Sequence, residues 1–235
     1  MQLRDWDDLP RFMRCDEVRE YYDILLKKKY SLKIKRVFDV TASSIMLVIL
    51  AIPMLVIAIL IKEDSPGPVF YRQERVTAYG KKFWIHKFRT MVNDADKKGS
   101  TVTVDNDARI TRVGRYLRRL RIDEFPQLLD VLAGDMTFVS TRPEATKYVK
   151  KYKKEWFATL LLPAGITSEA SIRYKDEARF LNKSDDVDMV YMEELLPRKM
   201  EWNLRAIRGF GIEKDFFIII RTVIALLFEE GQERA

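Results

Sequence analysis

Residues 40–61 read VTASSIMLVILAIPMLVIAILI and contain no charged side chain. A helix of that length spans the hydrocarbon core of a bilayer, roughly 30 Å, whereas the core helices of soluble proteins are usually shorter. The run therefore predicts a membrane helix, and a buried helix of a soluble protein is the alternative. Pro53 lies inside the run and predicts a kink, because proline removes a backbone hydrogen bond.

Basic residues flank this run on both sides. They normally mark the cytoplasmic side of a membrane, and a straight span would carry one of the two groups across. We therefore predict a re-entrant helix that bends at Pro53 and returns to its side of entry; an ordinary kinked span is the alternative. The flanking residues are Lys27, Lys28, Lys29, Lys33, Lys35 and Arg36 before the run, and Lys62, Arg72, Arg75, Lys81 and Lys82 after it.

The amino-acid composition limits which side chains could carry out catalysis. The 235 residues suffice for one compact domain with appendages, and the net charge of +7 suits nucleic acid, anionic lipid or phosphorylated substrates. A single cysteine, Cys15, excludes disulfides within the chain, and a single histidine, His86, excludes multi-histidine metal sites. Catalysis would thus depend on carboxylates, arginine and lysine, with His86 a structural or surface residue. Residues 1–20 lack the apolar segment of a cleavable signal peptide, and none is expected.

The remaining sequence predicts a compact α/β body, rich in helix and with little sheet. Residues 215–228 are apolar around Arg221 and too short to span a bilayer. They predict an amphipathic helix in the membrane interface, with a buried core helix as the alternative. Other helices are expected at residues 15–29, 111–120, 124–133, 147–161 and 191–207, strands at 69–73, 83–88 and 136–140, and a polar loop at 93–107.

A carboxylate pair, Asp123-Glu124, follows a group of arginines. Asp123 is expected where a helix begins, so that free backbone N–H groups and the helix dipole keep it ionised, as a nucleophile must be. The simpler interpretation is a helix cap beside a solvated basic face. Anion binding explains the arginines better, and nucleic acid is one such anion, although no aromatic platform accompanies them. The arginines are Arg109, Arg112, Arg115, Arg118, Arg119 and Arg121.

Six motifs occur in an order that resembles the bacterial sugar transferases, also called small monotopic phosphoglycosyl transferases. The resemblance covers roughly residues 33–224. The motifs are Lys35-Arg36-Val37-Phe38-Asp39, Ser65-Pro66-Gly67-Pro68-Val69-Phe70-Tyr71-Arg72-Gln73-Glu74-Arg75, Lys87-Phe88-Arg89-Thr90-Met91, Asp123-Glu124-Phe125-Pro126-Gln127-Leu128, Gly134-Asp135-Met136-Thr137-Phe138-Val139-Ser140, and Arg142-Pro143.

This resemblance implies a reaction and assigns residues to it. Asp123 would attack the sugar-bearing phosphate of a UDP-sugar, UMP would leave, and polyprenyl phosphate would collect the phospho-sugar. Glu124 would assist as a metal neighbour or acid/base, and Mg²⁺, which prefers oxygen ligands, would bind at Asp123 and Glu124. Arg118 and Arg142, with Arg89 as a weaker candidate, would bind the substrate phosphates.

The implied placement is the bacterial inner membrane, with the catalytic domain facing the cytoplasm and membrane lipid as a partner. Residues 1–32 would be a polar extension, residues 33–62 the re-entrant helix, and residues 63–235 the catalytic domain ending in the interface helix. No nucleic-acid partner is expected, and the oligomeric state stays open, with a homodimer as one alternative. A catalytically inactive membrane scaffold of the same fold and a membrane-tethered nucleic-acid binder are the rival functions.

Several positions depart from the family pattern without touching the carboxylate pair, and they leave the preferred sugar and nucleotide open. Thr141 replaces a usual proline before Arg142, and Asn203 replaces an acid, which loosens any functional role at that position. The other departures are Pro163-Ala164 for a basic residue and proline, Ser168-Glu169-Ala170-Ser171 for Gly-Trp-Ala-Gln, and Ile52-Pro53 for Ser-Pro.

Overall fold

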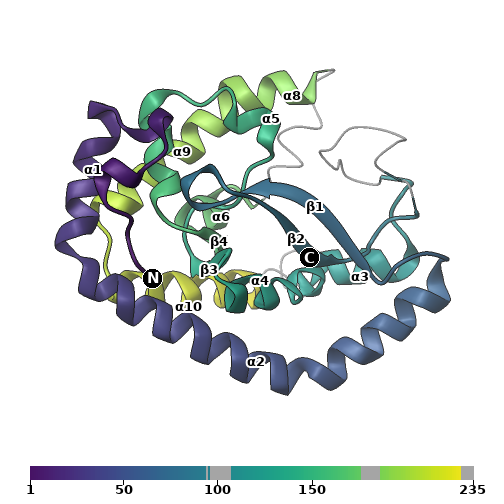
Figure 1. Ribbon diagram of the computed structural model, residues 1–235. Helices are drawn as coiled ribbons and strands as arrows, with labels where there is room; N and C mark the ends of the chain where they lie inside the picture. Colours follow the sequence, from purple (N-terminus) through teal and green to yellow (C-terminus); the bar gives the residue numbers. More distant parts are fainter. Residues whose placement is uncertain (94, 96–106, 176–185, 229–235) are drawn as a thin grey trace.

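The longest element is a single helix, α2, which runs from Lys29 to Asp64 and includes Pro53. The computed structural model describes residues 1–93, 95, 107–175 and 186–228. Figure 1 shows α2 as a bent helix that passes beneath the body and turns upward at both ends. The predicted helix at 40–61 is confirmed and begins earlier, because the basic residues before it continue the same helix.

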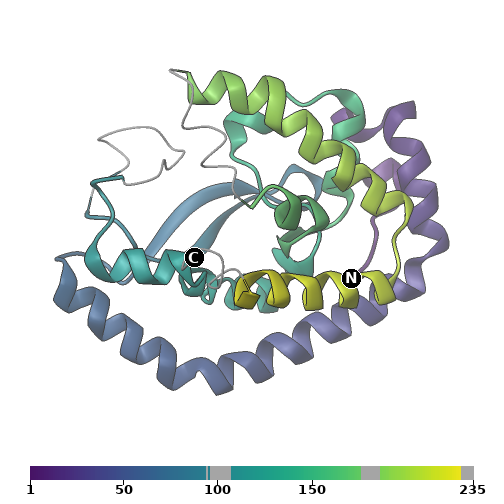
Figure 2. The same cartoon turned by 180° about the vertical axis from the view of Figure 1, so that it is seen from behind.

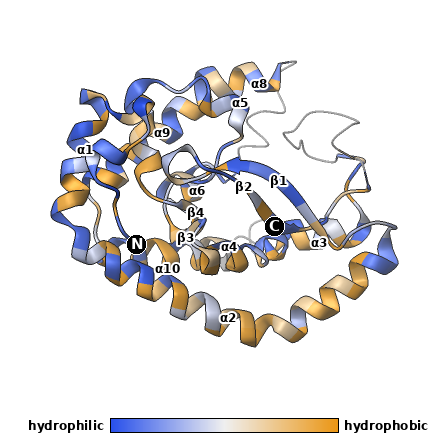
Figure 3. Ribbon diagram, viewed as in Figure 1, coloured by the Kyte–Doolittle hydropathy of each residue, from blue (hydrophilic) through white to orange (hydrophobic). Residues whose placement is uncertain are grey.

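The apolar middle of α2 faces outward. Val48 is 78% exposed and Ile52 75%, and Figure 3 shows the hydrophobic colouring along the outer arc of the helix. By length and composition α2 could cross a membrane, and only 6% of its most apolar window is buried. The alternative of a buried helix in a soluble protein is therefore wrong.

Two small sheets complete the α/β body. Strands β1 (Phe70–Val76) and β2 (Lys82–Phe88) form an antiparallel hairpin in which Arg72 lies opposite His86. Strands β3 (Met136–Val139) and β4 (Ala164–Thr167) pair in parallel. The three predicted strands and the prediction of little sheet are confirmed, whereas β4 was not predicted. The predicted loop at 93–107 lies mostly outside the described residues.

Three helices lie in a row between α2 and the rest of the body, as the two opposite views show (Figures 1 and 2). They are α3 (Arg112–Arg119), α4 (Gln127–Ala133) and α10 (Ile212–Phe228). The α10 side chains Phe216 and Phe217 are 57% and 61% exposed. The alternative of a buried core helix at 215–228 is therefore wrong. Arg221 pairs with Glu169, so the charge within the apolar segment has a partner in the body.

The N-terminal residues belong to the main core. Two short 3₁₀ turns (Trp6–Asp8 and Arg11–Met13) lead into α1 (Asp16–Lys27), whose Tyr21 and Leu25 are fully buried. The predicted polar extension at 1–32 is therefore not a separate segment in the packing. Its apolar side chains are spaced as in an amphipathic helix, and they pack against the second half of the chain.

The helices of that second half are shorter and more often interrupted than predicted. The expected helix at 147–161 divides into α5 (Thr146–Val149) and a 3₁₀ helix (Lys154–Leu161), and the expected helix at 191–207 is a π-turn (Tyr191–Leu195) followed by α9 (Leu196–Arg208). Two further short helices were not predicted, α6 (Glu169–Arg173) and α8 (Val187–Val190).

Polar side chains near the start of α2 join it to the body, and we call this region the anchor junction. Lys35 Nζ donates to the carbonyl of Val139 at 2.8 Å and to Asp215 of α10 at 2.6 Å. Asp39 accepts from Thr137 Oγ1 at 2.8 Å and from the backbone N–H of Phe138 at 3.2 Å. Completing the junction, Arg36 donates to the carbonyls of Val131 and Leu132. The junction therefore fixes the apolar α2 and α10 relative to β3 and α4.

Candidate active site

The carboxylate pair lies in a tight turn between α3 and α4. Arg121 adopts a left-handed conformation (φ 55°) and Ile122–Glu124 form one 3₁₀ turn, while α4 begins only at Gln127 with Pro126 as its cap residue. Asp123 is therefore not the helix cap that the sequence predicts. A left-handed non-glycine residue is uncommon and costs energy, and such residues gather at functional sites.

Two cations from separate strands or loops hold Glu124. Arg142 donates to both of its carboxylate oxygens, at 2.9 and 2.7 Å, and Lys87 of β2 donates at 2.9 Å. These contacts outweigh burial and hold the pKa of Glu124 well below its usual range. Arg142 also donates to the carbonyl of Ile166 in β4. Glu124 is thus a fixed, ionised carboxylate.

Asp123 has the opposite environment. Its side chain is buried, and Oδ1 has no hydrogen-bond partner among the described residues. Burial raises the pKa of Asp123, an effect that Lys87 opposes most strongly and Arg118 and Arg121 to a smaller extent. The expectation that backbone N–H groups keep this carboxylate ionised is therefore wrong, because α4 begins only at Gln127 and its N-terminus is not at Asp123. The charges that favour the ionised form come instead from Lys87, Arg118 and Arg121.

The predicted phosphate-binding arginines differ in what they contact. The charge of Arg118, partly buried on α3, interacts with Asp123 and Asp107, while burial lowers its pKa. Arg89 is almost fully buried and donates to the carbonyls of Pro66, Ser65 and Ile61. Arg89 therefore secures the end of α2, and its role with phosphate stays a prediction.

The six arginines do not form one site. Arg109 binds Asp107 through both carboxylate oxygens, whereas Arg112, Arg115 and Arg119 have exposed side chains on α3. Among the six, the charges of Arg118 and Arg121 lower the pKa of Asp123. Sequence reasoning grouped these residues because a run of arginines does not reveal which helix face each occupies.

Two neighbours of the carboxylate pair were not predicted. Lys87 appeared in the sequence only as part of a motif, although alternation along β2 puts it on the same face as the buried Phe83 and Ile85. Gln127 is fully buried next to the turn, and its amide has no partner within the described part of the chain. His86 itself is structural, as expected, because its ring and backbone N–H both contact the buried Asp130.

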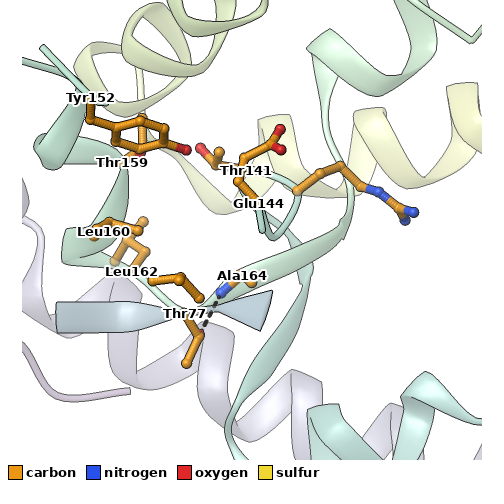
Figure 4. Close-up of a pocket in the computed structure, with 10 residues that line it drawn as sticks. Thr77, Thr141, Glu144, Tyr152, Thr159, Leu160, Leu162 and Ala164 are labelled. Carbon is orange, nitrogen blue, oxygen red and sulfur yellow. Dashed lines mark hydrogen bonds between the residues drawn. The ribbon is translucent and has the colours of Figure 1, made fainter. Parts of the chain in front are cut away.

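A small cavity lies against the loop that carries Arg142, which is one of its lining residues. Its volume, about 10 Å³, is room for roughly one water molecule. Figure 4 shows the hydroxyl end of Tyr152 pointing toward the loop with Thr141 and Glu144, and the hydrogen bond between Thr77 and the Ala164 backbone. Thr141 and Ala164, two departures from the family pattern, thus line the same cavity as Arg142, a predicted substrate residue.

The site offers limited ligands for a cation. No cluster of three or more His, Cys, Asp or Glu side chains occurs in the part of the chain that the structure describes. Mg²⁺ commonly binds one or two carboxylates and takes its other ligands from water and substrate phosphates. Asp123 and Glu124 could supply these one or two carboxylates, although Glu124 is already held by three hydrogen bonds.

Comparison with known proteins gives consistent matches. The model of the family described as bacterial sugar transferase matches residues 30–229. A UDP-N-acetylgalactosamine-undecaprenyl-phosphate N-acetylgalactosaminephosphotransferase of Aeromonas hydrophila is 34% identical over 197 residues, which is 83% of this chain and 44% of that protein. The UDP-glucose:undecaprenyl-phosphate glucose-1-phosphate transferase of Caulobacter vibrioides is 36% identical over 196 residues, or 82% of this chain and 69% of that protein. The chain thus spans less than half of the Aeromonas relative.

Proposed function

The chain belongs to the bacterial sugar transferase family, and from this membership we propose that it transfers a sugar-1-phosphate from a UDP-sugar to undecaprenyl phosphate. Relatives named for this reaction act with glucose or N-acetylgalactosamine. The observation that carries the proposal is the buried carboxylate of Asp123 beside cations that suit a diphosphate. The product would be the first lipid-linked intermediate of a membrane glycan or exopolysaccharide.

The proposed reaction has two displacement steps. A carboxylate oxygen of Asp123 attacks the phosphorus that carries the sugar, and the bond from that phosphorus to the bridging oxygen breaks, so that UMP leaves with this oxygen. A phosphate oxygen of undecaprenyl phosphate then attacks the same phosphorus. The bond to Asp123 breaks, the carboxylate is restored, and the sugar remains on a lipid diphosphate.

The neighbouring side chains have distinct roles in this scheme. Arg118 approaches Asp123 from α3 and supplies positive charge for the diphosphate, which eases attack of one anion on another. Arg142 and Lys87 keep Glu124 ionised, which favours a role beside a metal over a role as general acid. Mg²⁺, when bound at Asp123 with Glu124 nearby, would neutralise charge on the diphosphate.

We place the active site on the cytoplasmic face of the bacterial inner membrane, where nucleotide sugars occur. In that placement α2 is re-entrant and the exposed apolar face of α10 lies in the interface. The bend of α2 in Figure 1 and the basic residues on both flanks support this topology. The anchor junction supports it too, because it holds the start of α2 against the same body that carries β1 after its end.

Cysteine labelling in intact cells tests the topology. Cys15→Ser removes the native thiol, and Asp5→Cys and Lys82→Cys place single exposed thiols before and after α2. Lys82 is preferable to the neighbouring Gly80, whose positive φ of 76° and contact with Phe12 disfavour a side chain. Both thiols should resist an impermeant reagent until the cells are opened. Labelling of Asp5→Cys alone in intact cells would establish a spanning helix.

Release of UMP tests the activity. The full-length protein in detergent is incubated with a panel of UDP-sugars, with and without undecaprenyl phosphate. We expect one or a few sugars to give stoichiometric UMP without the lipid and repeated turnover with it, and intact-protein mass spectrometry to detect a phospho-sugar adduct. Absence of UMP release with every UDP-sugar would support an inactive scaffold instead.

A further inference from the structure

The amide of Gln127 is the most costly unexplained group near the site. Gln127 is the first residue of α4 and its side chain is 0% exposed, yet both Nε2 and Oε1 have no hydrogen-bond partner among the residues described. A buried amide without partners destabilises a fold, and an apolar side chain of the same shape would avoid that cost. Structure alone gives no reason for a glutamine at this position.

Oδ1 of Asp123, four residues earlier, is also buried without a partner among the described residues. Phe125 and Pro126 between them both have right-handed helical conformations, so the backbone from Asp123 to Gln127 makes slightly more than one helical turn. Residues four apart on such a turn share one face. Their chemistry is complementary as well, because a carboxylate oxygen only accepts hydrogen bonds and an amide NH₂ donates two.

We infer that Gln127 is a positioning residue for Asp123, an inference that rests on the proposed function. In the reacting complex Nε2 of Gln127 donates to Oδ1, which is buried and cannot reach a substrate. The donor then fixes the carboxylate so that Oδ2 faces the phosphorus. In the substrate-free structure the two groups are unpaired, and their pairing on substrate binding offsets part of the cost of ordering the site.

Gln127→Met distinguishes a positioning role from a structural one. Gln127→Met keeps the shape of the side chain and removes its polar atoms. A residue needed for structure would lose stability on this change, whereas removal of an unsatisfied amide leaves stability unchanged or raises it. A hydrogen bond to a charged group contributes enough to change a rate about ten- to a hundredfold. The variant should therefore be as stable as the wild type and yet slower.

The experiment measures the first half-reaction. Full-length wild type, Gln127→Met and Gln127→Glu are mixed with the accepted UDP-sugar without lipid, and the rate of adduct formation is followed by rapid quench and mass spectrometry across UDP-sugar concentrations. Thermal unfolding is measured in the same detergent. The matched control is Asn203→Leu, which removes another buried, unpartnered polar atom, on α9 in the main core.

We expect Gln127→Met to lower the saturating rate about ten- to a hundredfold, with the half-saturating UDP-sugar concentration unchanged and the unfolding midpoint not reduced. Gln127→Glu should be slower still, because it replaces the donor by a second anion beside Asp123. The rate of Asn203→Leu should match the wild type. A Gln127→Met variant with the wild-type rate, or one that loses rate only in proportion to lost stability, overturns the inference. Failure of the wild type itself to form an adduct overturns the proposed function as well.

Discussion

Buried carboxylates occur in two regions of this molecule, and their surroundings differ. At the anchor junction, Asp39 is fully buried and both of its oxygens accept hydrogen bonds, from Thr137 and from the backbone of Phe138. At the active-site turn, Asp123 is almost as deeply buried and its Oδ1 accepts none from the described residues. The first arrangement is that of a structural contact, in which each polar group that leaves water gains a partner.

The active-site turn instead leaves polar atoms unpaired, as a site does when a ligand is to supply their partners. Along with unpaired atoms on Asp123 and Gln127, it has a left-handed residue at Arg121 and a raised pKa at Asp123. The left-handed residue and the unpaired atoms cost folding free energy that the hydrogen-bonded groups of the anchor junction avoid, whereas a carboxyl pKa raised by burial occurs in both regions, at Asp123 and at Asp215. Burial alone therefore does not mark function in this chain; unpartnered buried atoms beside the carboxylate pair are the feature that points to it.

The largest expected effect follows from Asp123→Asn. An amide is a poor nucleophile, so we expect adduct formation and sugar transfer to fall by at least about 10³-fold. Because the change also removes a buried charge, thermal unfolding should not occur at a lower temperature. UMP release assays and calorimetry on the same preparation provide the measurement. Full activity in Asp123→Asn would show that Asp123 is not the nucleophile and that its carboxylate is no more functional than that of Asp39.

The second-largest expected effect is a loss of turnover on substitution of Arg118 or Arg142. Arg118→Ala removes a cation near Asp123, and Arg142→Ala removes the bidentate partner of Glu124; each should lower turnover about 10²-fold. Arg115→Ala, on the same helix as Arg118 but with an exposed side chain, is the matched control and should retain wild-type turnover. Equal losses in all three would mean that the arginines act only as a diffuse basic surface.

At the anchor junction, the expected effect of a mutation is on stability and not on activity. Asp39→Asn replaces one of two accepting oxygens by a donor, which leaves a buried donor of β3 unpaired and should lower the free energy of unfolding by about 1–3 kcal/mol. Activity per folded molecule should persist, because Asp39 accepts its hydrogen bonds from Thr137 and Phe138 of β3, away from the active-site turn. Denaturant titration followed by the UMP assay measures both quantities. Lost activity with unchanged stability would place Asp39 among the functional residues.

Much of the fold was predictable because its signals are local. The length of the apolar run predicted α2, alternation and bounding turn residues predicted β1 and β2, and Gly134, with φ 92°, ends α4 as expected. The N-terminal core was not predicted. Tyr21 and Leu25 look like part of a short polar helix until the residues that cover them, more than a hundred positions later, are known.

The sequence could point to a candidate site but not to its electrostatics. The order of the motifs singled out Asp123 and Glu124, whose catalytic roles stay a prediction, and only the three-dimensional structure shows that these adjacent carboxylates have opposite environments. The pKa of Glu124 is lowered by Arg142 and Lys87, which come from a loop and a strand distant in sequence. Sequence position alone suggested a helix start behind Asp123, because Pro126 commonly occupies the first turn of a helix; here the 3₁₀ turn delays that start to Gln127.

The smallest expected effect is a pH dependence that distinguishes the two carboxylates. Adduct formation requires ionised Asp123, and burial raises its pKa, so the rate should be constant at high pH and fall as pH decreases through this raised value, above that of an ordinary aspartate. Lys87 is the strongest opposing charge; Lys87→Met should therefore move the acid limb to higher pH, while the exposed Lys82→Met should not. The stability of the fold depends on pH in the opposite direction. Asp123 stays protonated to a higher pH in the folded state than in the unfolded chain, so the free energy of unfolding falls as pH rises from the ordinary aspartate pKa through the raised one. Asp123→Asn should abolish that fall. An acid limb at the position of an ordinary carboxylate, equal in wild type and Lys87→Met, would show that Asp123 does not titrate in the buried environment that distinguishes it from Asp39.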